Sequence, residues 1–216
     1  MANVVIIGAS GFVGKALVKE ALQRGHIVKA VARNPGKLDI QDGHLELAAA
    51  DVGDQTELSA LLSGADAVIS SYNPGWTNPD IAADTLSGYR SIIDAVKQAG
   101  VGRLLVVGGA GSLYLKPGLK VMDSGVIPEN ILPAVKALAE VYYSYLKAEN
   151  ELDWVFFSPA GTIAPGERTG KFRLGKDDLI TDEQGNSTIS VEDYAVAMLD
   201  ELESPRHHKE RFTIGY

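Results

Sequence analysis

Short apolar runs alternate with helical patterns along most of the chain. The apolar runs have the length of β-strands and lie at residues 4–7, 28–31, 45–49, 67–69, 104–107 and 154–157. Helical patterns lie between them, at 15–24, 54–62, 80–99 and 133–150. Strands that are apolar throughout and alternate with helices are typical of a parallel sheet covered on both faces. The sequence therefore predicts an α/β fold with a doubly wound parallel sheet.

The last quarter of the chain departs from this alternation. Residues 161–188 are rich in glycine and charge. Short strand candidates and one helical pattern are found at 172–174, 188–190, 191–202 and 211–214. Because this part is too short to hold its own core, we expect one domain over residues 1–216. Residues 161–190 would form a small C-terminal excursion, a lobe on the substrate side of the sheet.

The composition excludes several classes of protein. With 45% hydrophobic and 22% charged residues, the chain has the make-up of a soluble globular protein. No apolar run approaches the roughly 20 residues that span a bilayer, and no basic region followed by an apolar stretch opens the chain. The sequence has no cysteine, so disulfides, thiolate metal sites and cysteine nucleophiles are absent. We expect a cytoplasmic protein that does not associate with membranes.

The charge balance points to a small-molecule partner. The formal net charge of −8 disfavours binding to nucleic acid, which requires neutralisation of many phosphates. A small anionic ligand needs only a few local cations. The four histidines are scattered without metal-ligand spacing, so no metal site is expected: His26, His44, His207 and His208.

The strongest chemical signal is the glycine-rich segment GASGFVG at residues 8–14, between the first strand and the first helix. Its early glycines let the backbone turn tightly and approach a pyrophosphate, and the last lets helix and strand pack closely. The helix N-terminus adds amide donors and a positive dipole end. The predicted contacts with a dinucleotide are Gly8, Ser10, Gly11, Phe12, Val13 and Gly14. The alternative is a tight strand–helix turn that binds no ligand.

The end of the second strand indicates which dinucleotide is preferred. A carboxylate there would bind a ribose 2′-hydroxyl, whereas an arginine suits a 2′-phosphate. This chain has Arg33, and Lys37 or Lys15 could add positive charge. The sequence thus favours NADP(H) over NAD(H). The alternative for Arg33 is a solvated surface side chain.

Several segments together resemble the short-chain dehydrogenase/reductase superfamily. They are the turn at 8–14, VAR at 31–33, ADV at 50–52, VISS at 68–71, VVGGAGS at 106–112 and FSPA at 157–160. The resemblance covers nearly the whole chain. It is strongest to the atypical branch, with the NADH-flavin-reductase-like, biliverdin-reductase-B-like and NmrA-like proteins. PGERTG at 165–170 before FRLG at 172–175, and SVEDYA at 190–195, are most similar to the flavin-reductase group.

The resemblance implies an NAD(P)-binding Rossmann fold and further cofactor contacts. Asp51 and Val52 would border the adenine. Ser70, Ser71 and Tyr72 would line the ribose and nicotinamide side, and Pro159 and Ala160 would contact the nicotinamide amide through their backbone. Asp51 could instead cap a turn, and the two serines could simply end a strand.

The resemblance also supplies candidate catalytic residues. Active members commonly use a serine after the fifth strand, here Ser112, and a Tyr-x-x-x-Lys pair on the next helix, here Tyr143 and Lys147. Residues four apart share a face of a straight helix. The lysine would hold the ribose and lower the tyrosine pKa, so that the tyrosine acts as general acid or base. The atypical branch often lacks this tyrosine, so a packing role for Tyr143, with the proton taken from water, stays open.

A charged loop, Glu167–Lys171, follows the sixth strand, beyond the strand ends where doubly wound sheets bind ligands. It could orient an anionic or flavin-like substrate, or be a solvated loop held by local ion pairs.

Hydride transfer from NADPH to a flavin- or quinone-like acceptor is the function that these features favour. Two alternatives remain: a non-catalytic NADP-binding sensor that regulates a partner, and a nucleotide-sugar epimerase or dehydratase. The second is disfavoured because 216 residues leave little room for a sugar-nucleotide domain. The oligomeric state is not determined by the sequence.

Overall fold

The computed structural model describes residues 1–216 and is built around one eight-stranded sheet in the order β10-β12-β8-β5-β4-β1-β2-β3. Its strands are β1 Asn3–Ile7, β2 Ile27–Ala32, β3 Leu45–Ala49, β4 Ala67–Ser70, β5 Arg103–Val107, β8 Asp153–Ser158, β10 Arg173–Gly175 and β12 Glu210–Gly215. All neighbouring strands are parallel except β10, which runs antiparallel to β12 at one edge. The predicted doubly wound α/β fold is confirmed.

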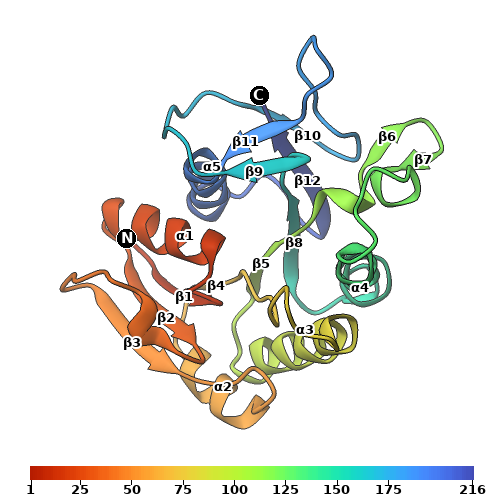
Figure 1. Ribbon diagram of the computed structural model, residues 1–216. Helices are drawn as coiled ribbons and strands as arrows, with labels where there is room; N and C mark the ends of the chain where they lie inside the picture. The colour runs from red at the N-terminus through yellow and green to blue at the C-terminus, as the bar shows by residue number, and fades with distance from the viewer.

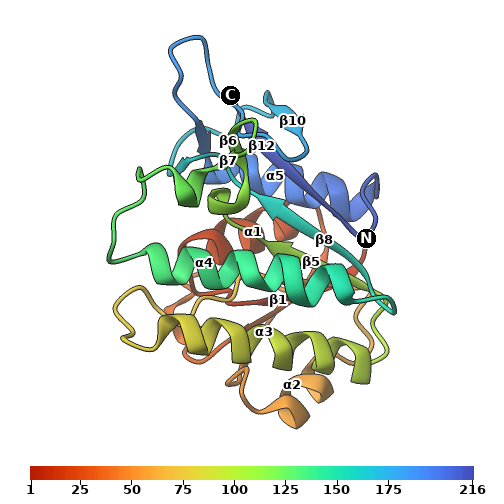
Figure 2. The same ribbon diagram turned by 90° about the vertical axis from the view of Figure 1, so that its right-hand side faces the viewer.

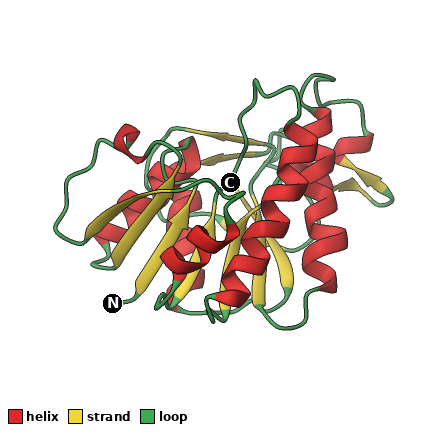
Figure 3. Cartoon of the chain, turned by 90° about the horizontal axis from the view of Figure 1, so that it is seen from below, coloured by secondary structure: helices red, strands yellow, loops and turns green.

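Helices cover both faces of this sheet, as the views in Figures 1 and 3 show. Helices α1 (Phe12–Gln23) and α5 (Val191–Glu203) pack on one face. Helices α2 (Gln55–Leu62), α3 (Ile81–Gln98) and α4 (Leu132–Glu140) pack on the other, where α3 and α4 lie side by side (Figure 2). No helix of the protein is both long and apolar enough to cross a membrane.

The alternation of side chains along each strand explains the two covered faces. In β1, Val4 and Ile6 belong to the core beneath α1 and α5, whereas Val5 and Ile7 belong to the core beneath α2 to α4. Successive residues of a strand point to opposite faces, so a strand covered on both sides must be apolar at every position. The strand-length runs of the sequence reflect this requirement.

The helix predicted over residues 133–150 is interrupted in the structure. Helix α4 ends at Glu140 and continues as a π-helical turn, Val141–Tyr145, and a 3₁₀ turn, Leu146–Ala148. The aromatic side chains of this turn pack in different directions. Tyr142 packs against Phe156, with ring centroids 5.1 Å apart, while the Arg90 guanidinium lies 4.7 Å from the ring centroid of Tyr145.

Residues 161–190 are joined to the main sheet. Their strand β10 extends the sheet edge, while β9 (Thr162–Ala164) and β11 (Thr188–Ser190) pair in parallel as a separate two-stranded sheet. A small hairpin of β6 (Tyr114–Lys116) and β7 (Leu119–Lys120), which the sequence did not predict, lies beside this segment. Backbone hydrogen bonds link Tyr114 to residues 177 and 179.

Candidate functional site

The turn between β1 and α1 lies where the backbone of three elements meets. Gly8 has a φ of +76°, and a Cβ there would lie 2.5 Å from the carbonyl oxygen of Ser71, at the end of β4. A Cβ at Gly14 would lie 2.2 Å from the Gly8 carbonyl oxygen. Glycine is therefore required at position 8 for its positive φ and its contact with Ser71, and at position 14 for the packing of the helix on the turn.

Helix α1 begins at this turn without a protein partner for its first amides. Its N-cap residue is Gly11, which has no side chain to cap the helix, and the first turn contains no acidic residue. The unpaired N–H groups and the positive end of the helix dipole therefore favour a bound anion. This local arrangement fits the phosphate contacts that the sequence predicted.

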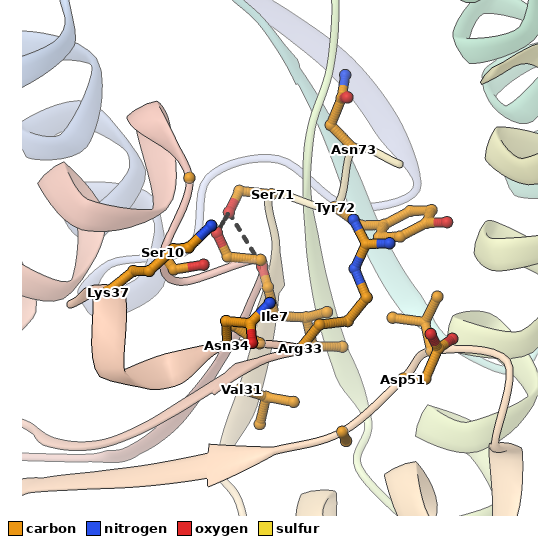
Figure 4. Close-up of a pocket in the computed structure, with 15 residues that line it drawn as sticks. Ile7, Ser10, Val31, Arg33, Asn34, Lys37, Asp51, Ser71, Tyr72 and Asn73 are labelled. Carbon is orange, nitrogen blue, oxygen red and sulfur yellow. Dashed lines mark hydrogen bonds between the residues drawn. The ribbon is translucent and has the colours of Figure 1, made fainter. Parts of the chain in front are cut away.

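A cavity of about 260 Å³ opens beside the turn, bordered by the carboxyl ends of β1 to β4 (Figure 4). Eight of the predicted cofactor residues line it: Gly8, Ser10, Gly11, Arg33, Asp51, Val52, Ser71 and Tyr72. Lys37 also lines this cavity, whereas Lys15 lies outside it. Sequence reasoning missed Asn34 and Asn73, which add amide groups to the lining and belong to no recognisable motif.

The charged residues of the cavity are held in defined positions. The Arg33 guanidinium donates a hydrogen bond to the Pro74 carbonyl at 3.2 Å, which connects the end of β2 to the segment after β4. Asp51 accepts a hydrogen bond from the Gly53 amide at 2.8 Å through Oδ1. The turn-capping role considered for Asp51 is thus present, and Oδ2 of its carboxylate has no protein donor.

The residues that follow β4 fix the opposite wall. The Ser71 hydroxyl lies within hydrogen-bond distance of the carbonyls of Ile7 and Gly8, at 3.0 and 3.2 Å (Figure 4). The Tyr72 hydroxyl donates to the Asp84 carbonyl at 3.2 Å, and its ring packs closely against Gly88 of α3. Burial, together with the nearby Asp84 carboxylate, raises the pKa of Tyr72, so this phenol stays neutral.

The remaining predicted cofactor residues do not line this cavity. Phe12 is half exposed at the start of α1, and Val13 packs against the core beneath that helix. The others are buried: Gly14 under the turn, Ser70 in β4, and Pro159 and Ala160 directly after β8.

The structure brings two of the three candidate catalytic residues together. The Tyr143 hydroxyl donates to the carbonyl of Ser112 over 3.4 Å. The Ser112 hydroxyl is buried and accepts a hydrogen bond from Arg211 at 2.9 Å. Lys147 is exposed, and its ammonium lies 5.8 Å from the ring centroid of Tyr142. Tyr143 lies in the π-helical turn and Lys147 in the 3₁₀ turn that follows, and no hydrogen bond joins their side chains.

Arg211 is a buried partner that sequence reasoning missed. Its side chain is 2% exposed, pairs with Asp177 and lies 4.7 Å from the ring centroid of Tyr142. Ninety-nine residues separate it from Ser112, and no local motif marks it. No group of three or more His, Asp or Glu side chains is placed to hold a metal ion.

Two buried carboxylates hold the charged loop, Glu167–Lys171, against the helices. Glu20 of α1 accepts two hydrogen bonds from Arg168, at 2.7 and 2.8 Å. Asp193 of α5 is fully buried and accepts from the backbone amides of Thr169 and Gly170, both at 2.8 Å. The hydroxyls of Thr169 and Tyr216 donate to its second oxygen, at 2.5 and 2.7 Å. Local ion pairs were expected in this loop; the observed pair joins Arg168 to Glu20 of α1.

Comparison with known proteins gives matches over nearly the whole length of this chain. The family model described as NAD(P)H-binding matches residues 8–205. An uncharacterized Bacillus subtilis protein, YwnB, is 39% identical over 97% of this chain and 96% of its own length. Cinnamoyl-CoA reductase 1 of Oryza sativa subsp. japonica is 29% identical over 75% of this chain, which matches about half (54%) of that reductase.

Two solved structures extend this similarity. A Bacteroides thetaiotaomicron protein named a putative epimerase is 59% identical, with a TM-score of 0.94 over 100% of this chain and 97% of its own. A Streptococcus pneumoniae protein named a putative NADH-flavin reductase is 36% identical, with a TM-score of 0.86 over 100% and 99% of the two chains.

The contact between Gly14 and Gly8 can be tested directly. Gly14→Ala places a methyl group against a backbone oxygen that has no room to move, and should destabilise the protein by about 1–3 kcal/mol. Gly102→Ala, where nothing lies within 4 Å, should change stability by less than about 0.5 kcal/mol. Urea unfolding measures both; equal stabilities would contradict the close packing of α1 on the turn.

The buried Asp193 carboxylate should make stability depend on pH. Burial raises its pKa, but the hydrogen bonds from Thr169, Gly170 and Tyr216 outweigh burial, and the pKa lies below its usual value. A lowered folded-state pKa stabilises the protein above the unfolded-state value, near 3.9, and this contribution is lost as pH falls through the folded-state pKa.

Asp193→Asn should therefore lower stability at pH 7, by about 1–3 kcal/mol. The difference from the unmodified protein should shrink below about pH 4. Urea unfolding across this pH range, with the exposed Asp123→Asn as control, measures the effect. A difference that stays constant down to about pH 3 would show that the carboxylate charge does not matter.

Proposed function

The chain belongs to the NAD(P)H-binding family, and we propose that it is an oxidoreductase that transfers hydride from NADPH to a flavin- or quinone-like acceptor. The observation that carries this proposal is the cavity at the glycine turn, where unpaired helix amides meet side chains from four strand ends. The similarity to a protein named an NADH-flavin reductase and, over part of the chain, to a cinnamoyl-CoA reductase supports hydride chemistry.

The residues of the cavity fit a dinucleotide. The amides at the start of α1 would hold the pyrophosphate, and the tight backbone turn from Gly8 to Gly11 would let it approach closely. Asp51 has one carboxylate oxygen without a protein donor, which suits an exocyclic amine of the adenine. Arg33 and Lys37 border the same cavity and would pair with a 2′-phosphate. No acidic residue ends β2 to bind a 2′-hydroxyl, which supports NADPH over NADH.

The reaction needs a hydride, a proton and an aligned acceptor. NADPH held at the turn would supply the hydride, and the acceptor would gain it together with one proton, with NADP⁺ as the second product. We propose that water supplies this proton. Ser112 is buried against Arg211, Tyr143 donates to a backbone carbonyl, and Lys147 makes no hydrogen bond to Tyr143. In this proposal the three residues shape the wall behind the site.

One neighbour favours a second candidate function. The name of the 59% identical Bacteroides protein suggests an epimerase, in which a sugar is oxidised and reduced again on the same cofactor. Such an enzyme would release no NADP⁺ and would act on a nucleotide sugar. A sensor would bind NADPH tightly and turn over neither class of substrate.

A single assay separates these functions. NADPH oxidation is followed at 340 nm with a panel of flavins, quinones, aldehydes and nucleotide sugars. We expect turnover of order 1 s⁻¹ with a flavin or quinone. Epimerised sugar without NADPH consumption would establish the second function, and tight binding without any turnover would establish the sensor.

Arg33 should determine the cofactor preference. Loss of a charge-assisted hydrogen bond worth roughly 1.5–3 kcal/mol in Arg33→Ala should weaken NADPH binding about ten- to a hundredfold and leave NADH binding nearly unchanged. Calorimetric titration with both cofactors measures this, with the exposed Arg206→Ala as control. Equal losses for the two cofactors would show that Arg33 acts through its bond to Pro74 instead.

Tyr143 tests the source of the proton. Tyr143→Phe keeps the ring and removes the hydroxyl, and turnover should stay within a few-fold, as in the control Tyr145→Phe. Loss of a general acid would instead cost about 10²–10⁴ in turnover. A fall of that size in a folded, cofactor-binding variant would restore Tyr143 as the proton donor.

A further inference from the structure

Arg33 is held by a neutral partner on another element. Its side chain extends from the end of β2 toward the segment after β4 (Figure 4), and its one hydrogen bond in the protein runs from Nη2 to the Pro74 carbonyl, at 3.2 Å. A carboxylate in this place would neutralise much of the guanidinium charge. A carbonyl fixes the side chain and leaves that charge for a ligand in the cavity, which Arg33 lines.

A tight turn presents this carbonyl. The Asn73 side chain accepts a hydrogen bond from the Gly75 amide at 2.8 Å through Oδ1, which closes the turn around Pro74. Pro74 is buried, its ring fixes its own φ, and the residue before a proline is confined to extended backbone. Gly75 has a φ of +119°, which residues with a side chain rarely adopt. These three residues together set the orientation of the Pro74–Gly75 peptide, and therefore the direction of its carbonyl.

This segment makes no other hydrogen bond to the rest of the protein. Of residues 73–77, only Pro74 bonds to a residue outside 73–78, and that residue is Arg33. The bonds that follow belong to the start of α3, where Asn78 binds the Asp84 carboxylate and the Asp80 amide. The polar groups of the turn therefore fix Arg33 and no other element.

A fixed arginine binds a phosphate more tightly than a mobile one. An exposed arginine has many rotamers, and a ligand that immobilises it must offset the lost conformational entropy. Arg33 is exposed at the end of β2, but its bond to Pro74 already restricts the guanidinium. This bond uses one N–H donor, so the other donors can bind a phosphate in the cavity.

We propose that the turn Asn73–Gly75 determines cofactor choice by positioning Arg33 for the 2′-phosphate of NADPH. In this role Gly75 is a positioning residue, although it does not line the cavity. The inference rests on the proposed function, because it concerns the cofactor preference of the same site. A cofactor with a 2′-hydroxyl in place of the phosphate gains little from a fixed guanidinium. The turn should therefore act on NADPH affinity and leave NADH affinity unchanged.

Calorimetric titration of Gly75→Ala with NADPH and NADH tests the inference without turnover. Alanine does not keep a φ of +119° without strain, so the Pro74 carbonyl should turn away from Arg33. NADPH binding should weaken about three- to tenfold, and NADH binding should stay within about twofold. Gly100→Ala is the matched control. This glycine also has a positive φ, +73°, with nothing within 4 Å, but it lies at the opposite end of α3. Neither affinity should change there.

A double-mutant cycle separates positioning from a general structural effect. If Gly75 acts through Arg33, then Gly75→Ala should leave the NADPH affinity of an Arg33→Ala protein within about twofold. Asn73→Ala is a second variant in case Gly75→Ala does not fold. It removes the bond that closes the turn and should lower the ratio of NADPH to NADH affinity in the same direction.

The outcomes separate this inference from the proposed function. Equal weakening of NADPH and NADH binding in the turn variants would overturn the inference, because the turn would then support the cavity as a whole. An unchanged affinity ratio, or a further loss of NADPH affinity in the Arg33→Ala background, would also overturn it. In each case hydride transfer to the acceptor panel would still support the oxidoreductase. A selective, Arg33-dependent loss in a protein that reduces no acceptor would keep the inference and reject the proposed reaction.

Discussion

The site depends on the close approach of three backbone segments at the first turn. Gly8 contacts the end of β4, and Gly14 contacts Gly8, at distances that leave no space for a Cβ. This contact sets the height of α1 relative to the sheet and directs its free amides over the strand ends. Arg33 and Asp51 line the cavity beside these amides, so a shift of α1 would change the shape of this cavity.

The buried charges of the molecule specify position more than they add stability. A buried ion pair gains little over well-packed apolar side chains, because desolvation offsets most of the attraction. Removal of one partner of the pair lowers stability, since the other charge stays buried without a partner. Burial raises the pKa of Glu20, but its bonds to Arg168 and Arg24 outweigh burial and keep it ionised. Glu20 and Asp193 therefore fix one place for the loop, whereas apolar contacts would allow several.

The sequence predicted what depends on local pattern. The apolar strands are confirmed to within a residue or two, and eight of the predicted cofactor residues line one cavity, because strand ends in a parallel sheet meet at one edge. Contacts between segments far apart in the chain were not predicted from the sequence. The bond from Arg211 to Ser112 and the pair of Glu20 with Arg168 join residues that no motif connects. The π-helical turn was not predicted either, because no local pattern marks it and its tyrosines contact side chains on other elements.

In the proposed reaction, the relative size of two catalytic effects favours alignment of the reactants over acid catalysis. Holding two reactants in a reactive geometry can supply about 7–11 kcal/mol of barrier reduction. A positioned general acid supplies a factor of about 10²–10⁴, which corresponds to roughly 3–5 kcal/mol. The buried carboxylates of Glu20 and Asp193 fix the loop. Ser112 accepts a hydrogen bond from Arg211, and Tyr143 donates to a backbone carbonyl. A flat acceptor that takes its proton from water needs the first effect and can do without the second.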